Sequence, residues 1–275
     1  MGSRLVIAGL YVPGDRPERF AKALATDADQ VIIDLEDAVA PDRKDAARAS
    51  VAEFLAGYDG VRVVVRTNGS DTPWQDADLA MLAGATRVPG LRLPKVQHPD
   101  DVSRVVERFA DPPRITCLIE SALGIENAYA IASHPRVSAI ALGEADLRAE
   151  LGITAEAGLD WLRVRSVVAA RAAGLDPPNM AVYPGLDDLD GLAESCAHGA
   201  TLGLWGRTAL HPKQVPVIRR AFAPDAAAVA HAEAVLAALA GSVGAARMPD
   251  GRMVDEAMAA EARRTLQLAR PDSDH

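Results

Sequence analysis

Short apolar runs recur along the chain, and Ala-rich segments with helical spacing of their apolar residues lie between them. Each run is apolar, and several are rich in Val or Ile. Gly, Pro or charged residues bound each run, which is typical of buried strands. The runs occupy residues 4–12, 31–37, 61–68, 90–96, 115–121, 137–147, 180–184 and 200–206. Eight strands that alternate with helices predict an α/β fold, a closed parallel (β/α)8 TIM barrel.

The C-terminal part of the sequence has a different character. No low-complexity linker interrupts the chain before about residue 222, so we expect the barrel to occupy residues 1–222. The remaining residues, 223–275, contain an Ala-rich helix that ends at Gly241, a polar segment, and a last helix from about Val254. We expect a helical extension that either caps its own barrel or reaches away from it as a lid.

Composition and charge narrow the class of protein. The 275 residues are 49% apolar and 24% charged, with a formal net charge of −9 and scattered Lys and Arg. This pattern argues against nucleic acid or an anionic membrane as the main partner. No apolar run approaches the roughly 20 residues of a membrane span, and the first residues are better interpreted as a strand than as a signal peptide. We therefore expect a cytoplasmic protein whose two cysteines, Cys117 and Cys196, are buried, inert thiols.

Ionisable side chains stand at the C-terminal ends of the predicted strands, where barrel enzymes carry their chemistry. They are Asp34, Glu36, Asp37, Arg66, Lys95, Glu120, Glu144 and Asp146. Any one of them is explained equally well as the first solvated residue after a strand. In the first cluster, Asp34 and Glu36 would share one face of the strand and Asp37 the other. We expect at least one of these three carboxylates to be a structural partner of Arg66, Lys95 or a backbone amide.

Glu120 and Asp146 follow adjacent predicted strands, an arrangement that suits a hard divalent cation. Mg2+ typically takes one or two protein carboxylates and leaves its other positions to water and substrate oxygens. The six histidines are dispersed, and no His and Cys set has zinc-site spacing. The sequence also lacks GxGxxG after a strand, a Walker A motif and GxSxG, the usual equipment of nucleotide and serine-hydrolase sites.

Longer motifs point to one family. The segments occur in a fixed order and cover nearly the whole chain: YVPGDRPERFAKAL, VIIDLEDAVAPDRKDAAR, VVVRTN, LPKV, LIESALGIENA, GEADL, ALHPKQVPVI and RMVDEA. Together they resemble the HpcH/HpaI aldolase and citrate lyase beta subunit (CitE-like) family of the pyruvate-binding barrel superfamily. Two positions depart from that pattern: Arg207 stands where relatives usually have Lys, and Met180 where many have Asp.

The resemblance implies roles for particular residues. Glu120 and Asp146 would hold Mg2+, and Arg66 would contact the oxygen on which charge develops, with Glu36 and Asp37 near the metal site. The residues that would contact the substrate or the coenzyme A phosphates are Arg16, Arg19, Lys22 and Lys95. Asp255 in RMVDEA would act as general acid/base over the active site of a neighbouring subunit. From the sequence alone the interpretation of Asp255 as the N-cap of the last helix is favoured, and the two roles are compatible.

The function that this resemblance implies is a Mg2+-dependent carbon–carbon lyase. It would cleave a 3-hydroxyacyl-CoA thioester of malyl, citramalyl or citryl type into an acyl-CoA and an oxo acid through an enolate. Two alternatives remain open: a metal-dependent aldolase of free hydroxy-oxo acids, and a citrate lyase beta subunit that is active only within a complex. The expected partners are CoA thioesters and oxo acids, and the family implies a homotrimer or hexamer.

Overall fold

The computed structural model describes residues 5–87, 90–240, 244–248 and 251–269. The chain divides into two compact units, Met1–Ala221 and Phe222–His275. The strands of the first unit are β1 (Ala8–Pro13), β2 (Gln30–Asp34), β3 (Val63–Arg66), β4 (Leu91–Leu93), β5 (Ile115–Ile119), β6 (Val137–Leu142) and β7 (Arg207–Ala209).

These strands form one curled, parallel sheet with the order β6-β5-β4-β3-β2-β1-β7. Met180 forms an isolated parallel bridge with Arg207, so the segment near residue 180 continues the sheet beyond β7. Parallel strands buried on both faces are typically continuous apolar runs, and Val31, Ile32, Ile33 and Val63 are fully buried. The fold is therefore an α/β half-barrel of the TIM-like kind.

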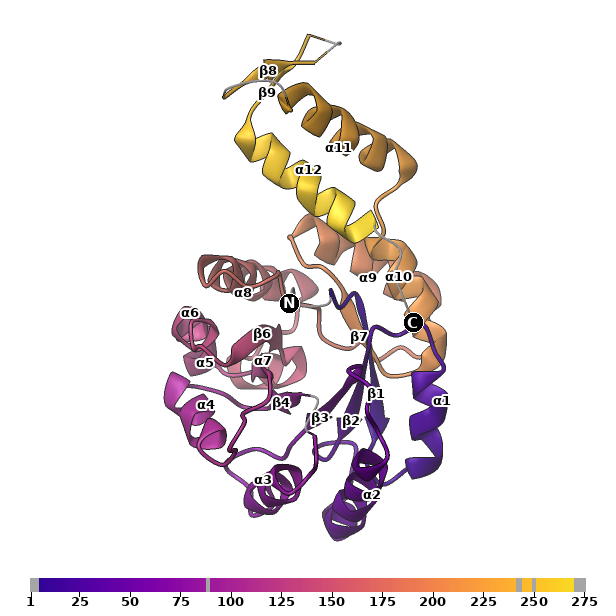
Figure 1. Cartoon of the computed structure of the whole chain (residues 1–275), viewed down its shortest axis with the longest axis vertical. Coiled ribbons are helices and arrows are strands. Elements are labelled where there is room, and N and C mark those ends of the chain that lie inside the picture. The colour runs from indigo at the N-terminus through magenta and orange to yellow at the C-terminus, as the bar shows by residue number, and fades with distance from the viewer. Residues whose placement is uncertain (1–4, 88–89, 241–243, 249–250, 270–275) are drawn as a thin grey trace. The chain divides into compact units, whose positions relative to one another are not determined.

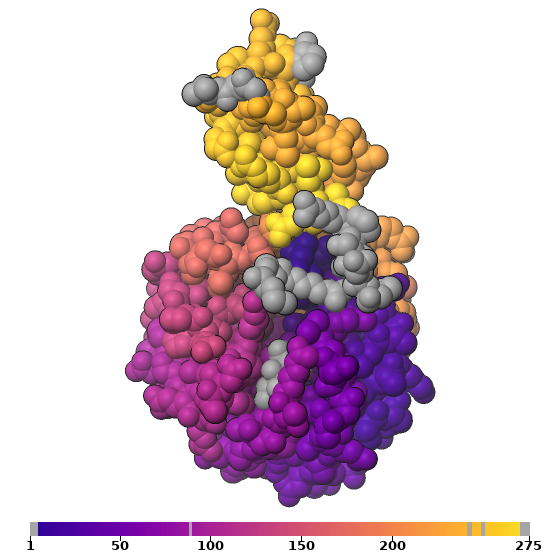
Figure 2. Space-filling view, in the orientation of Figure 1, coloured from indigo at the N-terminus to yellow at the C-terminus, as the bar shows by residue number. Residues whose placement is uncertain are grey.

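Helices cover the outer face of this sheet (Figure 1). Figure 2 shows the surface of the first unit in the same orientation, in colours from indigo to orange. The α-helices up to the end of this unit are α1 (Phe20–Leu24), α2 (Lys44–Ala56), α3 (Gln75–Ala83), α4 (Pro99–Val106), α5 (Ala122–Glu126), α6 (Ala128–Ala132), α7 (Glu144–Leu151), α8 (Asp160–Ala172), α9 (Leu189–Thr201) and α10 (Val215–Phe222).

The first six predicted strands are confirmed, with shorter bounds, whereas the last two are wrong in extent or position. The sixth strand ends at Leu142, and Asp146 lies in the first turn of α7 rather than on a strand. The seventh, 180–184, is reduced to the Met180 bridge. The eighth was expected at 200–206, but α9 continues to Thr201 and the strand is β7. Gly203, with a φ of 89°, turns the chain there, a conformation that glycine adopts without steric cost.

The second unit is a small helical hairpin with its own core. Its elements are α11 (Ala226–Leu239), β8 (Ala246–Arg247), β9 (Met253–Val254) and α12 (Glu256–Ala269). Strands β8 and β9 pair antiparallel. The buried side chains of Val235, Met248 and Val254 belong to one apolar cluster in this unit. This packing explains why the Ala-rich helix is stable beside a polar connecting segment.

The described residues also bear on two expectations from composition. Cys117 and Cys196 are both buried and free. Among these residues no single helix is long and apolar enough to cross a membrane, and only the consecutive helices Pro212–Phe222 and Ala226–Leu239, taken together, have sufficient length and hydropathy.

Gly206 provides a test of the packing at the edge of β7. A Cβ there would overlap the Ile7 carbonyl oxygen, which accepts a hydrogen bond from the Arg207 amide at 2.8 Å. We expect Gly206→Ala to lower the free energy of unfolding by about 2 kcal/mol, as overpacking typically does. Denaturant titration measures it, and Gly57→Ala is the control because no atom lies within 4 Å of its new Cβ. Equal stability of the two variants would contradict this packing.

Candidate active site

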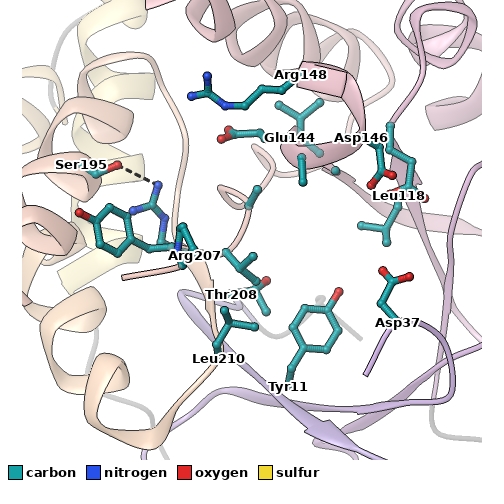
Figure 3. A pocket seen from close by; sticks show the side chains of 18 of the residues that line it. Tyr11, Asp37, Leu118, Glu144, Asp146, Arg148, Ser195, Arg207, Thr208 and Leu210 are labelled. Carbon is teal, nitrogen blue, oxygen red and sulfur yellow. Dashed lines mark hydrogen bonds between the residues drawn. The ribbon is translucent and has the colours of Figure 1, made fainter. Parts of the chain in front are cut away.

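A cavity of about 1030 Å³ lies at the C-terminal ends of the strands of the first unit. Its lining comes from all seven strands of the sheet, from the loops that follow them, and from α7, α8 and α9. Figure 3 shows Asp37 and Asp146 on one side of it, Arg207 on the opposite side, and the Tyr11 hydroxyl pointing into the space between them. The cavity occupies the end of the sheet where the sequence predicts the chemistry.

The Asp34–Arg66 ion pair lies at the wall of this cavity. Asp34 ends β2 and Arg66 ends β3, and the parallel register places the two residues side by side. Arg66 Nε donates to Asp34 Oδ1 at 2.7 Å and Arg66 Nη2 to Asp34 Oδ2 at 2.6 Å. Both residues are buried. A bidentate pair of this kind fixes the orientation of the guanidinium as well as its charge.

Two further carboxylates surround the same arginine. Arg66 Nη1 lies 2.9 Å from Glu36 Oε2 and 3.3 Å from Asp37 Oδ2. The expectation of a structural partner for Arg66 is confirmed, but the expected opposite orientation of Asp37 is wrong. Because β2 ends at Asp34, the two-residue alternation of a strand does not continue to Asp37, and all three carboxylates converge on Arg66.

A buried lysine holds the loop that carries these carboxylates. Lys44 Nζ donates to the carbonyl oxygens of Leu35 and Glu36 and to Asn68 Oδ1, at 2.6–2.8 Å. Asn68 in turn donates through its backbone and side-chain nitrogens to Asp78. Burial lowers the pKa of Lys44. The lysine has a hydrogen-bonding partner for each of its three protons, so it fixes the loop after β2 to the loop after β3.

The environment changes the proton affinity of these groups. Burial raises the pKa of Glu36 to about 8; the charge of Arg66 opposes this, and those of Asp37, Glu120 and Asp34 add to it. Burial alone would lower the pKa of Arg66, but its hydrogen bonds to Asp34 and the charge of that carboxylate raise it. Glu36 is therefore protonated at neutral pH while Arg66 keeps its charge.

Glu120 and Asp146 both line the cavity, although they come from different kinds of element. Glu120 follows β5 and accepts a hydrogen bond from the Lys95 amide through Oε1. Lys95 has a φ of 54°, the left-handed conformation that non-glycine residues rarely adopt. Gly143 allows the carboxylate to lie against the start of α7, because a Cβ there would overlap Glu120 Oε2.

This carboxylate pair has the chemistry of a site for a hard divalent cation. Burial raises the pKa of Glu120, the Lys95 amide opposes this, and the charge of Asp146 raises it further. A cation between two such carboxylates would offset their mutual repulsion. No cluster of three or more His, Cys, Asp and Glu side chains suited to a metal occurs in the described part of the chain. Two carboxylates are nevertheless enough for Mg2+, which keeps several water or substrate ligands.

The structure does not bring the predicted coenzyme A residues into the lining of this cavity. Arg16, Arg19 and Lys22 are exposed around the first helical turns. Arg16 and Arg19 each lie near an acidic neighbour in the chain, at 3.8 Å from Asp15 and from Glu18 respectively. The Lys95 side chain contacts Asp71 at 3.3 Å and borders a separate cavity of about 450 Å³.

Asp255 belongs to the second unit and caps α12. Its Oδ1 accepts hydrogen bonds from the backbone amides of Ala257 at 3.0 Å and Met258 at 3.2 Å. The interpretation as an N-cap is confirmed.

Three polar residues of the cavity, Tyr11, Arg92 and Arg163, were missed in the sequence, whereas Arg207 was noted only as a departure from the family pattern. Tyr11 lies beneath two guanidinium groups, those of Arg66 at 4.7 Å and Arg92 at 5.4 Å from its ring centroid. Arg163 is buried and paired with Glu144 at 2.8 Å. Arg207 is buried against Ser195 (Figure 3). An arginine within an apolar strand, as in GLRLPKV, was the signal for Arg92; Arg163 lies in a helix whose partners come from distant segments.

Comparison with known proteins decides the family. The model of the HpcH/HpaI aldolase/citrate lyase family matches residues 7–212. The chain belongs to this family.

Relatives in the HpcH/HpaI family match almost the full length. A (3S)-malyl-CoA thioesterase of Cereibacter sphaeroides is 36% identical, over 94% of this chain and 93% of that protein. An L-malyl-CoA/beta-methylmalyl-CoA lyase of the same species is 34% identical, over 90% and 89%. CitE of Mycobacterium tuberculosis, solved in complex with magnesium, acetoacetate and coenzyme A, is 34% identical with a TM-score of 0.82, over 96% of this chain and 98% of that chain.

Glu36 gives a pH-dependence that can be measured on metal-free protein. Its pKa in the folded chain is about 8, against 4.5 for the ordinary group, so the folded state binds the extra proton between these values. The contribution of Glu36 to the free energy of unfolding is therefore largest below pH 4.5. It is lost as pH rises toward 8, because the folded state must then give up a proton that it binds more tightly than the unfolded chain does. The free energy of unfolding falls over this range by an amount on the order of a few kcal/mol.

Replacing Glu36 by Gln should flatten this part of the stability profile. Urea titration between pH 4.5 and 9 measures the free energy of unfolding, and Glu53→Gln on the exposed face of α2 is the control. A profile for Glu36→Gln that is parallel to those of the wild type and the control would contradict the raised pKa.

Proposed function

We propose that this chain is a Mg2+-dependent carbon–carbon lyase that cleaves a 3-hydroxyacyl-CoA thioester into an acyl-CoA and an oxo acid. The observation that carries the proposal is the arrangement of Glu120 and Asp146 in one cavity with the Arg66 network. Family membership supports a lyase, and the named activity of the malyl-CoA lyase relative supports a thioester substrate. The magnesium, acetoacetate and coenzyme A bound by the CitE relative support the metal and both parts of the substrate.

Glu120 and Asp146 are the residues that would hold Mg2+. When bound, the cation supplies positive charge to the oxygens of the oxo-acid part of the substrate. The Lys95 amide and the space left by Gly143 orient the Glu120 carboxylate for this role. Preorientation matters because a ligand that is already fixed needs no rearrangement when the cation and the substrate bind.

Arg66 would stabilise the oxygen on which negative charge develops when the carbon–carbon bond breaks. Its guanidinium is oriented by Asp34 before substrate arrives, and preorganised charge in a site shielded from water is typically the largest catalytic contribution. Glu36 and Asp37 would tune this charge. A protonated Glu36 leaves Arg66 less neutralised than three ionised carboxylates would.

Proton transfer needs a further group at the substrate. We assign it to Asp255 from a neighbouring subunit, which would take the hydroxyl proton and return a proton to the acyl-CoA enolate. Capping of α12 orients this carboxylate and leaves Oδ2 free of the two capping bonds. The exposed cations Arg16, Arg19 and Lys22, together with Lys95, would contact the coenzyme A portion.

This assignment implies an assembly. In a homotrimer or hexamer, residues 223–275 of one subunit would act as a lid on the site of its neighbour and complete that site. The proposed barrel of residues 1–222 would close between β6 and the Met180 segment. The bridge of Met180 to Arg207 supports closure, since it adds the segment at the free edge beyond β7. We place the enzyme in the cytoplasm, where oxo acids and acyl-CoA thioesters meet.

A second candidate activity is hydrolysis of the thioester. The similarity to (3S)-malyl-CoA thioesterase at 36% identity favours it. The two activities differ in the bond that breaks: a lyase releases an acyl-CoA and an oxo acid, whereas a thioesterase releases free coenzyme A and a hydroxy acid. The same carboxylate pair and Arg66 serve either reaction, so product analysis distinguishes them.

The proposal is tested by incubating the protein with Mg2+ and malyl-, citramalyl-, citryl- and 3-hydroxy-3-methylglutaryl-CoA. We expect one of them to yield an oxo acid without free thiol. EDTA or Asp146→Ala should reduce the rate at least about 100-fold, because either one removes the cation that would hold the oxygens of the oxo-acid part. Asp190→Ala, at the exposed start of α9, is the control and should leave the rate unchanged.

Other outcomes contradict the proposal in distinct ways. Release of free thiol with a hydroxy acid would favour the thioesterase. Cleavage of free hydroxy-oxo acids without thioester cleavage would favour the aldolase, and cleavage only in a mixture with partner subunits would favour the complex-bound citrate lyase subunit. Full activity in EDTA would show that the reaction does not need a metal ion.

A further inference from the structure

Arg92 is a buried cation in the cavity, and no carboxylate among the described residues pairs with it. It occupies the middle of β4, is 6% exposed, and lines the cavity. Its Nε has no hydrogen-bonding partner. No carboxylate of the described residues lies within 4.0 Å of its guanidinium, whose recorded side-chain contact is the Tyr11 ring.

Arg66, the arginine next to Arg92 in the sheet, is surrounded by carboxylates. Arg66 pairs with Arg92 in the parallel register, so the two side chains start from adjacent positions of the sheet, and both lie over Tyr11. Arg66 contacts three carboxylates, whereas Arg92 contacts none in the described chain. The negative charge of the network is therefore concentrated on Arg66, and Arg92 remains available to an anion from outside the protein.

An uncompensated buried charge destabilises a folded protein unless another interaction offsets the free-energy cost of its desolvation. Arginine cannot relieve this by losing its proton. A ligand anion in the cavity would supply the missing partner. Thr208 also lines this cavity (Figure 3), and its buried hydroxyl has no hydrogen-bonding partner.

The position of Arg92 limits what the anion is. Arg92 lies within the sheet, in register with Asp34 and Arg66, whereas Glu120 and Asp146 follow the ends of β5 and β6. Arg66, in register with Arg92, would contact the oxygen on which charge develops, and the carboxylate pair would hold the oxo-acid oxygens. The substituent of the oxo acid is then the part of the substrate left for Arg92. The bulky coenzyme A must leave through the open end. A small anionic substituent, a carboxylate, fits this place.

We propose that Arg92 binds a second carboxylate on the oxo-acid part of the substrate. The preferred thioester then carries two free carboxylates, and the oxo acid that it releases is dicarboxylic. This inference rests on the proposed function, because it takes the carboxylate pair as the holder of the other end of the oxo acid.

Oxo acids that differ in one group test the inference directly. Oxaloacetate and 2-oxobutyrate have the same length, with a carboxylate in one where the other has a methyl group, and 2-oxoglutarate and 2-oxovalerate form a second such pair. Calorimetric titration of the full-length protein in Mg2+ gives the four dissociation constants. We expect the wild type to prefer the dicarboxylic member of at least one pair about 10-fold to 100-fold, the range of a charge-assisted hydrogen bond.

Arg92→Met keeps an unbranched apolar side chain and removes the guanidinium and its charge. This variant should lose the preference for the dicarboxylic acid while its affinity for the monocarboxylic acid changes less than about 3-fold. Arg92→Lys should retain part of the preference. The control is Arg104→Met on α4, an arginine whose side chain is 67% exposed, which should behave as the wild type. Without ligand, Arg92→Met should unfold at the same or a higher temperature than the wild type, since it removes a buried unpaired charge.

The results separate this inference from the proposed function. Equal affinity of the wild type for both members of both pairs, or an unchanged preference in Arg92→Met, would overturn the role of Arg92 and leave the lyase proposal intact. Absence of Mg2+-dependent binding of every oxo acid to the wild type would overturn both. A lower unfolding temperature for Arg92→Met than for Arg104→Met would contradict the uncompensated charge.

Discussion

The bidentate pair between Asp34 and Arg66 is the interaction on which the site depends. It joins the ends of β2 and β3, and it gathers Glu36 and Asp37 around one guanidinium. Lys44 fixes the same loop from behind through carbonyl oxygens, so the loop is held by hydrogen bonds of both its side chains and its backbone. A position so constrained keeps charged groups in place before a substrate arrives, which lowers the reorganisation that a reaction would otherwise require.

The distribution of charge over the cavity follows from this arrangement. Carboxylates outnumber cations around Arg66, and burial keeps one of them, Glu36, protonated at neutral pH. Glu120 and Asp146 repel each other on a neighbouring part of the lining, while Arg92 has no carboxylate partner in the described chain. The protein alone therefore leaves an excess of negative charge at the proposed metal site and an excess of positive charge at Arg92. A divalent cation and an anionic substrate together would neutralise both.

Much of this was predictable because apolar runs and charges at strand ends are local patterns. The first six strands and the grouping of Arg66, Glu36, Asp37, Glu120 and Asp146 follow from such patterns. The strand at Arg207–Ala209 was misplaced because it is short and polar, while the more apolar residues before it end a helix and turn at Gly203. Arg92 was missed because only the three-dimensional structure shows that it lacks a partner. The positions of Asp255 and of the predicted coenzyme A residues relative to a substrate depend on other chains or ligands, which a single sequence does not contain.

The central claim is that Glu120 and Asp146 hold the cation with which the oxo acid binds. Calorimetric titration of Mg2+ in the presence of an oxo acid tests it on the wild type, on Glu120→Gln, which keeps an acceptor for the Lys95 amide, and on Glu126→Gln, an exposed control on α5. We expect one Mg2+ per chain and a loss of affinity of at least about 10-fold in Glu120→Gln alone. Equal Mg2+ affinity in all three proteins would contradict the account.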